Sequence, residues 1–381
     1  MPKKIIYIFQ NSFWGKDIKT SGGDVRVAYI FKKIQVHFLK IIIFGNKEAF
    51  LFNMDYGPNA HFVITPELFD KFGICISYFL RTIFVVWQLF FLQRDGYLYS
   101  ASDFFPDVLP AYIFKNKNNK WIQIIHHIYP SWKTRPGNII INFVGYYLQR
   151  LSFFLINNKA DRIVVVSPFV KEGLLNLGFD KNKIHVSSNA IDIENLDKIK
   201  EKKQGYDGVF LGRLNYSKGV FDLIEIWKNI YSKYYDAKLG IIGGGEKEIR
   251  DSLLKKIKEY DLEKNIDILG YLKYEEVFAI LKASKIFLFP SHEEGWGIAI
   301  AEAMACNLPV VSWGLSVYKS IFGDHTIQVK ENDINLFSEK VAELLQNESK
   351  RAKIGISGYE FIKKYSWDNI AMKELELINN L

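Results

Sequence analysis

The chain has 381 residues, of which 49% are hydrophobic and 24% are charged. These proportions are those of a globular protein, and the length suits two domains of ordinary size. The net charge of +8 is uneven, because residues 1–190 hold 23 Lys and Arg against 12 Asp and Glu. A basic half is compatible with nucleic acid, anionic lipid or a phosphorylated substrate. No nucleic-acid-binding motif accompanies the charge, so we expect no nucleic-acid partner.

The cysteines and the first residues of the chain indicate the cellular compartment in which the protein is expected. Cys75 and Cys306 are too far apart in sequence to form a disulfide framework or a zinc motif, which favours a reducing cytosol. The opening stretch, MPKKIIYIFQ, lacks the shape of a signal peptide because its apolar run is short and polar residues follow it. We therefore expect a cytoplasmic protein.

The first predicted strand, Lys4 to Phe9, is not followed by a dinucleotide-binding G-x-G-x-x-G turn. A long loop instead ends in the Ser-Gly-Gly-Asp stretch Ser21 to Asp24, whose two end residues are good helix caps. The helix itself is predicted from Val25 to about Ile34. Gly22 and Gly23 allow the backbone to approach a ligand closely, although a plain flexible connection is the alternative.

An apolar stretch from Phe72 to Leu92 is long enough to suggest a membrane span. Arg81 lies at its middle, where a charge costs about 3 kcal/mol on insertion scales, and Gln88 adds to that cost. The strand that follows, Tyr97 to Ser100, is needed beside the first strand of a doubly wound sheet. We therefore expect a helix that covers the sheet, with a true span as the alternative.

Two adjacent histidines, His126 and His127, follow the strand Lys120 to Ile125. The carboxyl end of a strand is where doubly wound domains place groups that contact ligands. From spacing alone, however, two neighbouring histidines in a loop are more often surface decoration. The other strands predicted in this half are Phe38 to Phe44, Asp161 to Ser167 and Lys183 to Ser187.

The stretch Asn138 to Asn157 is rich in aromatic residues and has the period of a helix. This stretch has two interpretations. The helix either packs on the sheet of its own domain or contacts anionic lipid at a membrane surface. The second interpretation rests on the basic residues in and around the helix, which are Lys133, Arg135, Arg150, Lys159 and Arg162.

Residues 193–206 are rich in Lys, Glu and Asp and are predicted to link two domains. The next strand, Asp207 to Leu211, runs into the loop Gly-Arg-Leu-Asn-Tyr-Ser-Lys-Gly. Arg213 can pair with two phosphate oxygens at once, and Lys218 adds a point charge. Gly212 and Gly219 keep the backbone close to a ligand. A basic surface loop without a ligand is the alternative.

A second glycine turn follows the strand Lys238 to Ile242 and contains Gly244 and Glu246. The remaining predicted elements are a strand from Ile266 to Leu269 and helices over Phe221 to Tyr231, Glu275 to Ala283, Asp333 to Leu345, Lys350 to Tyr365 and Trp367 to Leu381.

The most informative stretch is Ile286 to Trp313, which predicts a strand, a glycine-rich loop, a helix and another strand. A helix that begins directly after such a loop presents free N–H groups and the positive end of its dipole to an anion. The backbone groups expected to serve as this anion site belong to Gly295, Trp296, Gly297 and Ile298.

Glu294 and Glu302 lie in this stretch with seven residues between them. The surrounding string, P-S-x-x-E-G-x-G-x-x-x-x-E-A-M-A-x-x-x-P-V-V, is far more specific than a pair of glutamates. It resembles the signature of the retaining glycosyltransferases that carry an E-x7-E motif on a GT-B fold, known as family 4 or group 1 glycosyltransferases. The loop from Gly212 to Gly219 resembles their G-R-L-x-x-x-K-G diphosphate loop.

The resemblance implies a role for each matched residue. Glu294 would lie beside the donor sugar, Glu302 would bind the ribose, and His126 would contact the donor sugar or the acceptor, with His127 as the substitute. The catalytic set implied is Glu294, Arg213, Lys218 and His126. The donor-binding set implied is Gly22, Gly23, Gly212, Gly244, Glu246, Gly295, Trp296, Gly297, Ile298 and Glu302.

The fold expected is α/β: a GT-B fold whose two doubly wound Rossmann-like domains face a central cleft. The domains expected are residues 1–192 and 207–366, with the helix 367–381 crossing back to the first. The resemblance implies a retaining hexosyltransferase that moves a sugar from a nucleotide-diphosphate donor to a glycan or lipid-linked acceptor. It implies no metal and no cofactor, since Arg213 and Lys218 can neutralise the diphosphate. The alternatives are a GT-B phosphorylase, a nucleotide-sugar epimerase and a catalytically silent binding module.

The charge and the two aromatic-rich helices of the first half also predict a location. We expect the first domain to sit on the inner face of the plasma membrane as a peripheral protein, with an anionic membrane surface as a partner. Lipid-linked glycan or cell-surface polysaccharide synthesis would be the corresponding process.

Overall fold

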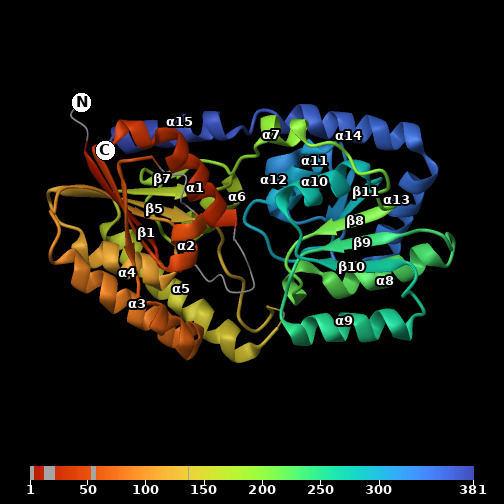
Figure 1. Cartoon of the computed structure of the whole chain (residues 1–381), viewed down its shortest axis with the longest axis horizontal. Coiled ribbons are helices and arrows are strands. Elements are labelled where there is room, and N and C mark those ends of the chain that lie inside the picture. The colour runs from red at the N-terminus through yellow and green to blue at the C-terminus, as the bar shows by residue number, and fades with distance from the viewer. Residues whose placement is uncertain (1–3, 13–21, 53–56, 136) are drawn as a thin grey trace. The chain divides into compact units, whose positions relative to one another are not determined.

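The computed structural model describes residues 4–12, 22–52, 57–135 and 137–381, and the side chains of residues 51, 52, 74 and 75 lie outside the description. The chain forms two compact units (Figure 1). Unit 1 comprises residues 1–190 and 367–381, and unit 2 comprises residues 191–366. The predicted cap Ser21 lies outside the described residues. The predicted linker, residues 193–206, belongs to unit 2 and opens with the helix α7 (Ile193–Lys198).

Unit 1 contains a parallel sheet in the order β3-β2-β1-β4-β5-β6-β7. Its strands are β1 (Ile5–Gln10), β2 (Lys40–Gly45), β3 (Ala60–Ile64), β4 (Gly96–Ser100), β5 (Asn119–Ile125), β6 (Arg162–Val165) and β7 (Ile184–Val186). The inner strands are buried on both faces, which is why they read as continuous apolar runs in the sequence. The edge strand β3 is only partly buried, and the sequence analysis did not predict it.

Helices cover both faces of this sheet. One face packs on α1 (Gly22–Ile34) and α15 (Trp367–Asn379), and the other packs on four helices. These four are α3 (Gly73–Leu89), α4 (Phe105–Phe114), α5 (Ile139–Lys159) and α6 (Pro168–Asn176), and α2 (Lys47–Phe52) precedes β3. Figure 1 shows α3, α4 and α5 below the sheet of unit 1 and α1 and α15 above it. Gly22 and Gly23 lie in the first turn of α1 and not, as predicted, in the loop before it.

Arg81 of α3 is buried and bonded within unit 1. It pairs with Asp70, and its Nη1 donates to the carbonyl oxygen of Asn11 at 3.1 Å. Since α3 contributes Val85 and Leu89 to the hydrophobic core on one face of the sheet, it covers the sheet as predicted. Among the described helices, α5 is the one long and apolar enough to cross a membrane by length and composition, and 33% of its apolar window is buried.

The last helix, α15, belongs to unit 1 and is held there by a buried ion pair. Glu374 of α15 accepts from Arg26 Nη2 of α1 at 2.8 Å and from the Tyr99 hydroxyl at 2.9 Å. Arg26 Nη2 also donates to the Ser187 carbonyl oxygen at 3.1 Å. Both charged side chains are fully buried, so the far end of the chain becomes part of the core of unit 1.

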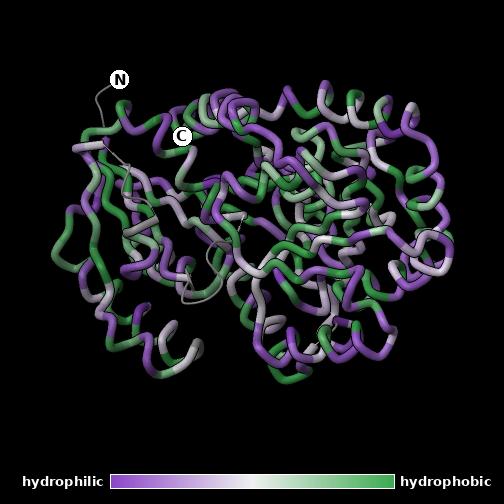
Figure 2. The backbone as a smooth tube through the Cα atoms, turned by 45° about the vertical axis from the view of Figure 1, so that its right-hand side comes forward, coloured by the Kyte–Doolittle hydropathy of each residue, from purple (hydrophilic) through white to green (hydrophobic). Residues whose placement is uncertain are grey.

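Unit 2 contains a second parallel sheet in the order β10-β9-β8-β11-β12-β13. Its strands are β8 (Gly208–Leu211), β9 (Leu239–Ile242), β10 (Ile266–Gly270), β11 (Ile286–Phe289), β12 (Val310–Trp313) and β13 (Ile327–Val329). Its further helices are α8 (Val220–Tyr231), α9 (Lys247–Glu259), α10 (Tyr274–Ala283), α11 (Ile298–Ala305), α12 (Ser316–Phe322), α13 (Ile334–Gln346) and α14 (Glu348–Ile362). Figure 2 shows hydrophilic residues gathered along the outer turns and loops.

The strand order of unit 2 reverses between β8 and β11. From β8 the chain moves outward through β9 and β10, and it then returns to place β11 on the other side of β8. In doubly wound sheets, ligands bind outside the carboxyl ends of the strands at this switch point. The loops after β8 and β11 are therefore where a ligand of unit 2 is expected.

Candidate functional site

The loops after β8 and β11 touch directly in unit 2. The backbone N–H of His292 donates to the carbonyl oxygen of Ser217 at 2.8 Å, and Ser291 Oγ donates to the same oxygen at 3.2 Å. The two most informative motifs of the sequence are thus joined by hydrogen bonds at the switch point of the sheet.

Glycine makes this approach possible. Gly219 has a φ of +65°, and a Cβ atom there would lie 1.8 Å from the carbonyl oxygen of Pro290. Gly243, which follows β9, has a φ of +139°, and its Cβ would lie 1.8 Å from the carbonyl oxygen of Gly212. Both distances are far below van der Waals contact, so side chains are excluded at the two points where the loops meet.

The turn after β9 is attached to the same loop. Leu214 N donates to the carbonyl oxygen of Gly244 at 2.8 Å. Glu246 is exposed and precedes α9. The structure therefore brings the predicted residues Gly212, Gly244 and Glu246 together at one edge of the sheet.

Lys218 and Glu294 form an ion pair across the two loops. Lys218 Nζ donates to Glu294 Oε1, and it also lies 3.4 Å from the carbonyl oxygen of Glu293. Both side chains are largely buried, which strengthens their attraction relative to a surface pair. Arg213, in contrast, is exposed. Glu294 thus holds Lys218 in position, whereas Arg213 is accessible from solvent and can pair with an anionic ligand.

The helix α11 begins at this edge with Gly297 as its N-cap. Gly297 has a φ of +104° and provides no side-chain cap, so the first N–H groups of α11 remain available to a ligand. The ring of Trp296 is buried and packs against Phe322 and Tyr365 at centroid distances of 5.6 and 5.5 Å. Only the backbone of Trp296 can serve the site. Gly295 lies in the same loop, and Ile298 is the first residue of α11.

Glu302 lies on α11 and is partly buried. Burial raises the pKa of its carboxyl group to about 8. Within the part of the chain that the structure describes, no hydrogen bond or ion pair offsets that burial. The group is therefore suited to accept or donate a hydrogen bond when a polar ligand arrives.

His292 is a site residue that the sequence analysis missed. Its Nε2 lies 2.9 Å from Asp222 Oδ2 on α8, and its Nδ1 lies 2.6 Å from Glu331 Oε1 after β13. Burial lowers the pKa of His292, but the hydrogen bonds to the two carboxylates outweigh burial and raise it. The imidazole ring of His292 therefore links the loop that carries Glu294 to α8 and to the segment after β13. A histidine two residues before the motif glutamate was the only sequence signal, and its partners lie far away in the chain.

In unit 1 the structure brings His126 and Gly23 together. A Cβ atom on Gly23 would lie 2.8 Å from His126 Nε2, so the glycine leaves room for the ring. His126 Nε2 donates to the carbonyl oxygen of Ala101 at 2.8 Å, and burial lowers the pKa of the ring to about 4. His126 is therefore neutral at physiological pH. The ring of His127 instead packs at 5.6 Å from that of Tyr129.

Two buried aspartates organise the same sheet edge and were also missed. Asp107 accepts from the backbone N–H of Asn11 at 2.6 Å and from Ser102 Oγ at 2.6 Å, and burial raises its pKa to about 7. Asp103 accepts from Gln149 Nε2 at 2.7 Å, and burial raises its pKa to about 6. These bonds tie the loops after β1 and β4 to α5. Across the described residues, no three His, Cys, Asp or Glu side chains are grouped to hold a metal ion.

Two family models match the chain. The model described as glycosyl transferases group 1 matches residues 192–361, and the model described as glycosyltransferase family 4 matches residues 76–195. Together they span the second half of unit 1 and nearly all of unit 2.

Several curated proteins are similar in sequence. The chain is 31% identical over 230 residues to an uncharacterized glycosyltransferase of Methanocaldococcus jannaschii, which covers 58% of this chain and 60% of that protein. It is 28% identical over 257 residues to the capsular polysaccharide biosynthesis glycosyltransferase CapM of Staphylococcus aureus, with coverage of 62% and 65%. The chain thus matches about three fifths of the length of these relatives.

Solved structures share the fold over the whole chain. Anabaena HepE in complex with UDP-glucose has a TM-score of 0.77 at 15% identity and covers 99% of this chain and 100% of its own. Staphylococcus aureus TarM has a TM-score of 0.74 at 15% identity, with coverage of 100% and 99%. These likenesses confirm the predicted fold class of two Rossmann-like α/β units of the GT-B type.

Proposed function

The chain belongs to the group 1 glycosyl transferases, and we propose that it transfers a sugar from a nucleotide-diphosphate donor to an acceptor hydroxyl with retention at the anomeric carbon. The observation that carries the proposal is the junction of the two loops in unit 2. There the ion pair of Lys218 and Glu294 lies beside the exposed Arg213 and the open N-terminus of α11.

The chemistry of the step fits these groups. The bond between the anomeric carbon and the donor phosphate oxygen breaks, and a bond to the acceptor oxygen forms on the same face of the sugar. The acceptor proton passes to the departing phosphate. Arg213, Lys218 and the first N–H groups of α11 would stabilise the negative charge that develops on the diphosphate. Since preorganised donors supply this stabilisation, we propose that no metal ion and no cofactor are needed.

The remaining residues would position the donor. Glu294 would lie beside the sugar, where Lys218 orients it, and Glu302 would hydrogen bond the ribose hydroxyls. Gly244 and Glu246 would border the donor after β9. In unit 1, Nε2 of the neutral His126 already donates to Ala101, so its Nδ1 would accept a hydrogen bond from a hydroxyl of the sugar or the acceptor. The first turn of α1 at Gly22 and Gly23 would approach that ligand.

The acceptor class is proposed from the relatives. Their names describe capsular polysaccharide biosynthesis, a poly(ribitol-phosphate) α-N-acetylglucosaminyltransferase and an O-antigen chain mannosyltransferase. We propose that this chain also transfers a hexose to a glycan or lipid-linked acceptor in cell-surface polysaccharide synthesis. We further propose a cytoplasmic location, which the two sequence-distant cysteines favour.

A donor screen tests the proposal first. Ligands that bind only the folded state raise the melting temperature by mass action, so nucleotide sugars can be ranked by thermal shift. UDP-sugars come first because the structural neighbour HepE was solved with UDP and with UDP-glucose. The absence of a shift with every nucleotide sugar would contradict the proposal.

Kinetics with the best donor then separate the candidate functions. Transfer to an acceptor that survives EDTA supports metal-independent glycosyl transfer, whereas activity restored only by magnesium or manganese would contradict it. Inorganic phosphate acting as a substrate would identify a phosphorylase, and an epimerised donor without an acceptor would identify an epimerase. Donor binding without any turnover would identify a binding module.

Glu294→Gln and Glu302→Gln distinguish the two motif glutamates. A ribose contact is similar in the ground and transition states, so Glu302→Gln should raise KM more than it lowers kcat. Glu294→Gln should lower kcat more strongly. The opposite pattern would mean that the two roles are exchanged.

A further inference from the structure

The outward sides of α3 and α5 in unit 1 are hydrophobic. On α3 the exposed side chains recur every three or four residues and form one stripe: Ile76, Phe79, Ile83, Trp87 and Phe90. On α5 the exposed side chains are Ile139, Ile140, Ile141, Phe143, Val144, Tyr147, Leu148, Leu151 and Phe154. Phe79 is 65% exposed and Ile140 is 70% exposed, so most of the surface of each side chain contacts solvent.

Both helices lie on the same face of the sheet. They contribute Val85, Leu89, Phe153 and Ile156 to one hydrophobic core, and α4 packs against each of them. Ile113 of α4 is also exposed. We call the outward surface of α3, α4 and α5 the apolar face; Figure 1 shows these helices on one side of the unit 1 sheet.

A helix on the surface of a soluble domain buries one apolar stripe and turns a polar side to water. Here the outward sides of α3 and α5 are apolar instead. Their buried sides mix apolar residues with polar ones, which are Ser77, Arg81 and Thr82 on α3 and Asn142, Gln149 and Ser152 on α5. Extended apolar surfaces of this kind on folded proteins mark protein or membrane contacts.

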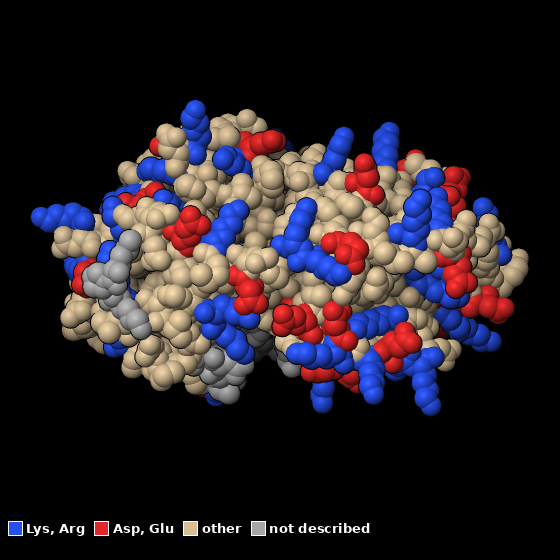
Figure 3. Space-filling model, turned by 90° about the horizontal axis from the view of Figure 1, so that it is seen from above, with Lys and Arg blue, Asp and Glu red and all other residues tan. Residues whose placement is uncertain are grey.

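Cations outnumber acidic residues along α3 and α5, where the exposed Asp95 directly follows Arg94 and Asp70 pairs with the buried Arg81. Residues 71–94 and 129–160 contain no Asp or Glu, and their cations are Lys71, Arg81, Arg94, Lys133, Arg135, Arg150 and Lys159. Lys71, Arg94 and Lys133 are exposed. The side of α15 is different, because Figure 3 shows Lys and Arg interspersed with Asp and Glu there.

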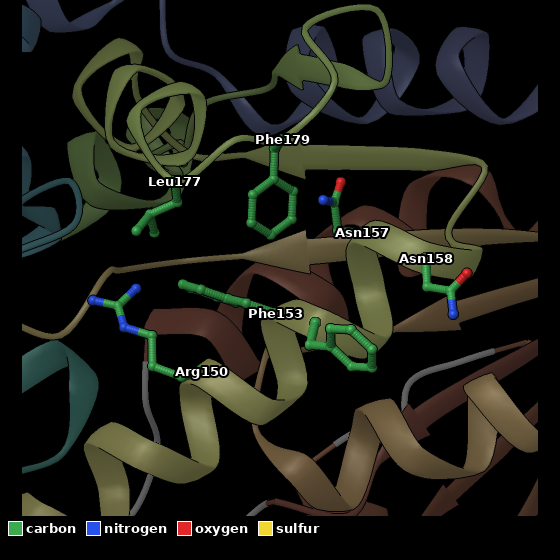
Figure 4. A pocket seen from close by; sticks show the side chains of 7 residues that line it. Arg150, Phe153, Asn157, Asn158, Leu177 and Phe179 are labelled. Carbon is green, nitrogen blue, oxygen red and sulfur yellow. The ribbon is translucent and has the colours of Figure 1, made fainter.

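A hollow of about 400 Å³ opens beside α5 and is lined by Arg150, Phe153, Phe154, Asn157, Asn158, Leu177 and Phe179. Figure 4 shows Leu177 and Phe179 facing α5 across it. Arg150 Nη1 is buried without a hydrogen-bond partner, although its guanidinium lies 4.7 Å from the ring centre of Tyr146. The hollow thus combines aromatic and aliphatic side chains with the guanidinium of Arg150.

We propose that the apolar face docks on an anionic lipid bilayer, with α3 and α5 lying along the membrane surface. The apolar side chains would enter the boundary between headgroups and acyl chains, while the bordering cations would pair with lipid phosphates. A two-fold contact with a second copy would instead bring the same cations of both copies together, which disfavours self-association.

The geometry also disfavours spanning. The 17 residues of α3 extend about 26 Å, less than the ~30 Å hydrocarbon core. On α5, the buried Asn142, Gln149 and Ser152 face into unit 1, so the helix cannot leave the sheet without exposing polar groups to lipid. The proposal does not depend on the proposed sugar transfer, because its test measures only membrane binding.

Flotation of the full chain with vesicles tests the proposal. We expect it to float with vesicles of phosphatidylcholine and phosphatidylglycerol, to float much less with phosphatidylcholine alone, and to be released as salt rises, since salt screens the attraction. The double variant Phe79→Gln/Ile140→Gln should lose most of this binding. The matched control is Tyr235→Gln/Ile356→Gln in unit 2, where the side chains are 69% and 59% exposed, and it should float like the wild type.

Three results would overturn the proposal. The first is a wild-type protein that stays at the bottom of the gradient with anionic vesicles at low salt. The second is that the variant Phe79→Gln/Ile140→Gln, called the face variant, floats as well as the control. Alternatively, sedimentation would show a dimer that the face variant alone abolishes, which would assign the apolar face to self-association. Circular dichroism of each variant establishes that it is folded before flotation, and Ile83→Gln replaces Phe79→Gln if that variant unfolds.

Discussion

Lys218 Nζ pairs with Glu294 Oε1, and this ion pair joins the loop after β8 to the loop after β11. The proposed diphosphate cation and the proposed donor-sugar carboxylate are therefore one physical unit. Removing either charge leaves the other largely buried without its partner, which costs more than losing a surface pair. The first prediction follows from this coupling.

Lys218→Ala and Arg213→Ala should each reduce kcat/KM. Arg213→Ala should cost little stability because Arg213 is exposed, whereas Lys218→Ala should also lower the free energy of unfolding because it leaves Glu294 largely buried without its partner. A hydrogen bond to a charged group contributes about 1.5–3 kcal/mol, which corresponds to roughly a tenfold to hundredfold loss of rate. Lys233→Ala, at an exposed position of unit 2, is the control and should leave kcat/KM unchanged. Full activity in both test variants would contradict the diphosphate assignment.

Glu302→Gln should change how stability depends on pH. Because burial raises the pKa of Glu302 to about 8 from an ordinary 4.5, the folded state keeps a proton that the unfolded state releases between these values. Stability therefore falls as pH rises through that window. Glutamine does not titrate, so the variant should gain stability relative to the wild type from about pH 5 to about pH 8.

Urea unfolding at several pH values measures that difference. Glu248→Gln on α9 is the control because its side chain is exposed, and the pH dependence of Glu302→Gln is compared with it. A constant difference for Glu302→Gln would mean that the Glu302 carboxyl group is ionised in the folded protein.

His292→Gln should weaken unit 2 most at low pH. Hydrogen bonds to Asp222 and Glu331 outweigh burial and raise the pKa of His292 above its ordinary 6.5. The stabilisation is therefore complete below the unfolded pKa and disappears as pH rises through the raised folded value. The melting temperatures of wild type and variant should differ more near pH 6 than near pH 9.

The same variant should lower kcat, because the braced loop carries Glu294. His325→Gln serves as the control, since the ring of His325 bonds to the hydroxyl of Ser357 and not to a carboxylate. A pH-independent loss of stability in His292→Gln would indicate that the ring packs as a neutral group.

Gly219→Ala should destabilise the protein strongly, because the new Cβ would collide with the carbonyl oxygen of Pro290. Gly270 is a matched control: its φ of +68° is close to the +65° of Gly219, but no atom lies within 4 Å of its Cβ position. Gly270→Ala should cost about 1 kcal/mol through backbone conformation alone. Equal melting temperatures for the two variants would contradict the close contact between the loops.

Glu374→Ala should lower the free energy of unfolding by about 3–5 kcal/mol, because it leaves Arg26 buried without its carboxylate. Glu376→Ala, two residues later on α15 at an exposed position, should change stability little. Chemical denaturation of both variants measures the effect. A small cost for Glu374→Ala would mean that α15 is held by its apolar contacts and not by the ion pair.

The sequence by itself determined the fold class and most of the site in unit 2. Strands that are buried on both faces appear in the sequence as continuous apolar runs. A close contact between two loops requires glycine at the contact point. Both features can therefore be recognised from a short stretch of sequence. The motif glutamates and the loop from Gly212 to Gly219 were located through the resemblance of the strings around them to a family signature. The start of α1 could not, because Gly22 and Gly23 disfavour a helix by propensity and the packing of α1 overrides that preference.

Only the tertiary structure decided which distant residues meet. His292 with Asp222 and Glu331, and Arg26 with Glu374, are partners that no local pattern connects. The orientation of Trp296 was also undecided, because an aromatic residue in a glycine loop can face a ligand or the core. The outward side of α3 and α5 was likewise decided by the tertiary structure. The sequence shows that both helices are apolar, but packing on the sheet decides which of their apolar residues remain exposed.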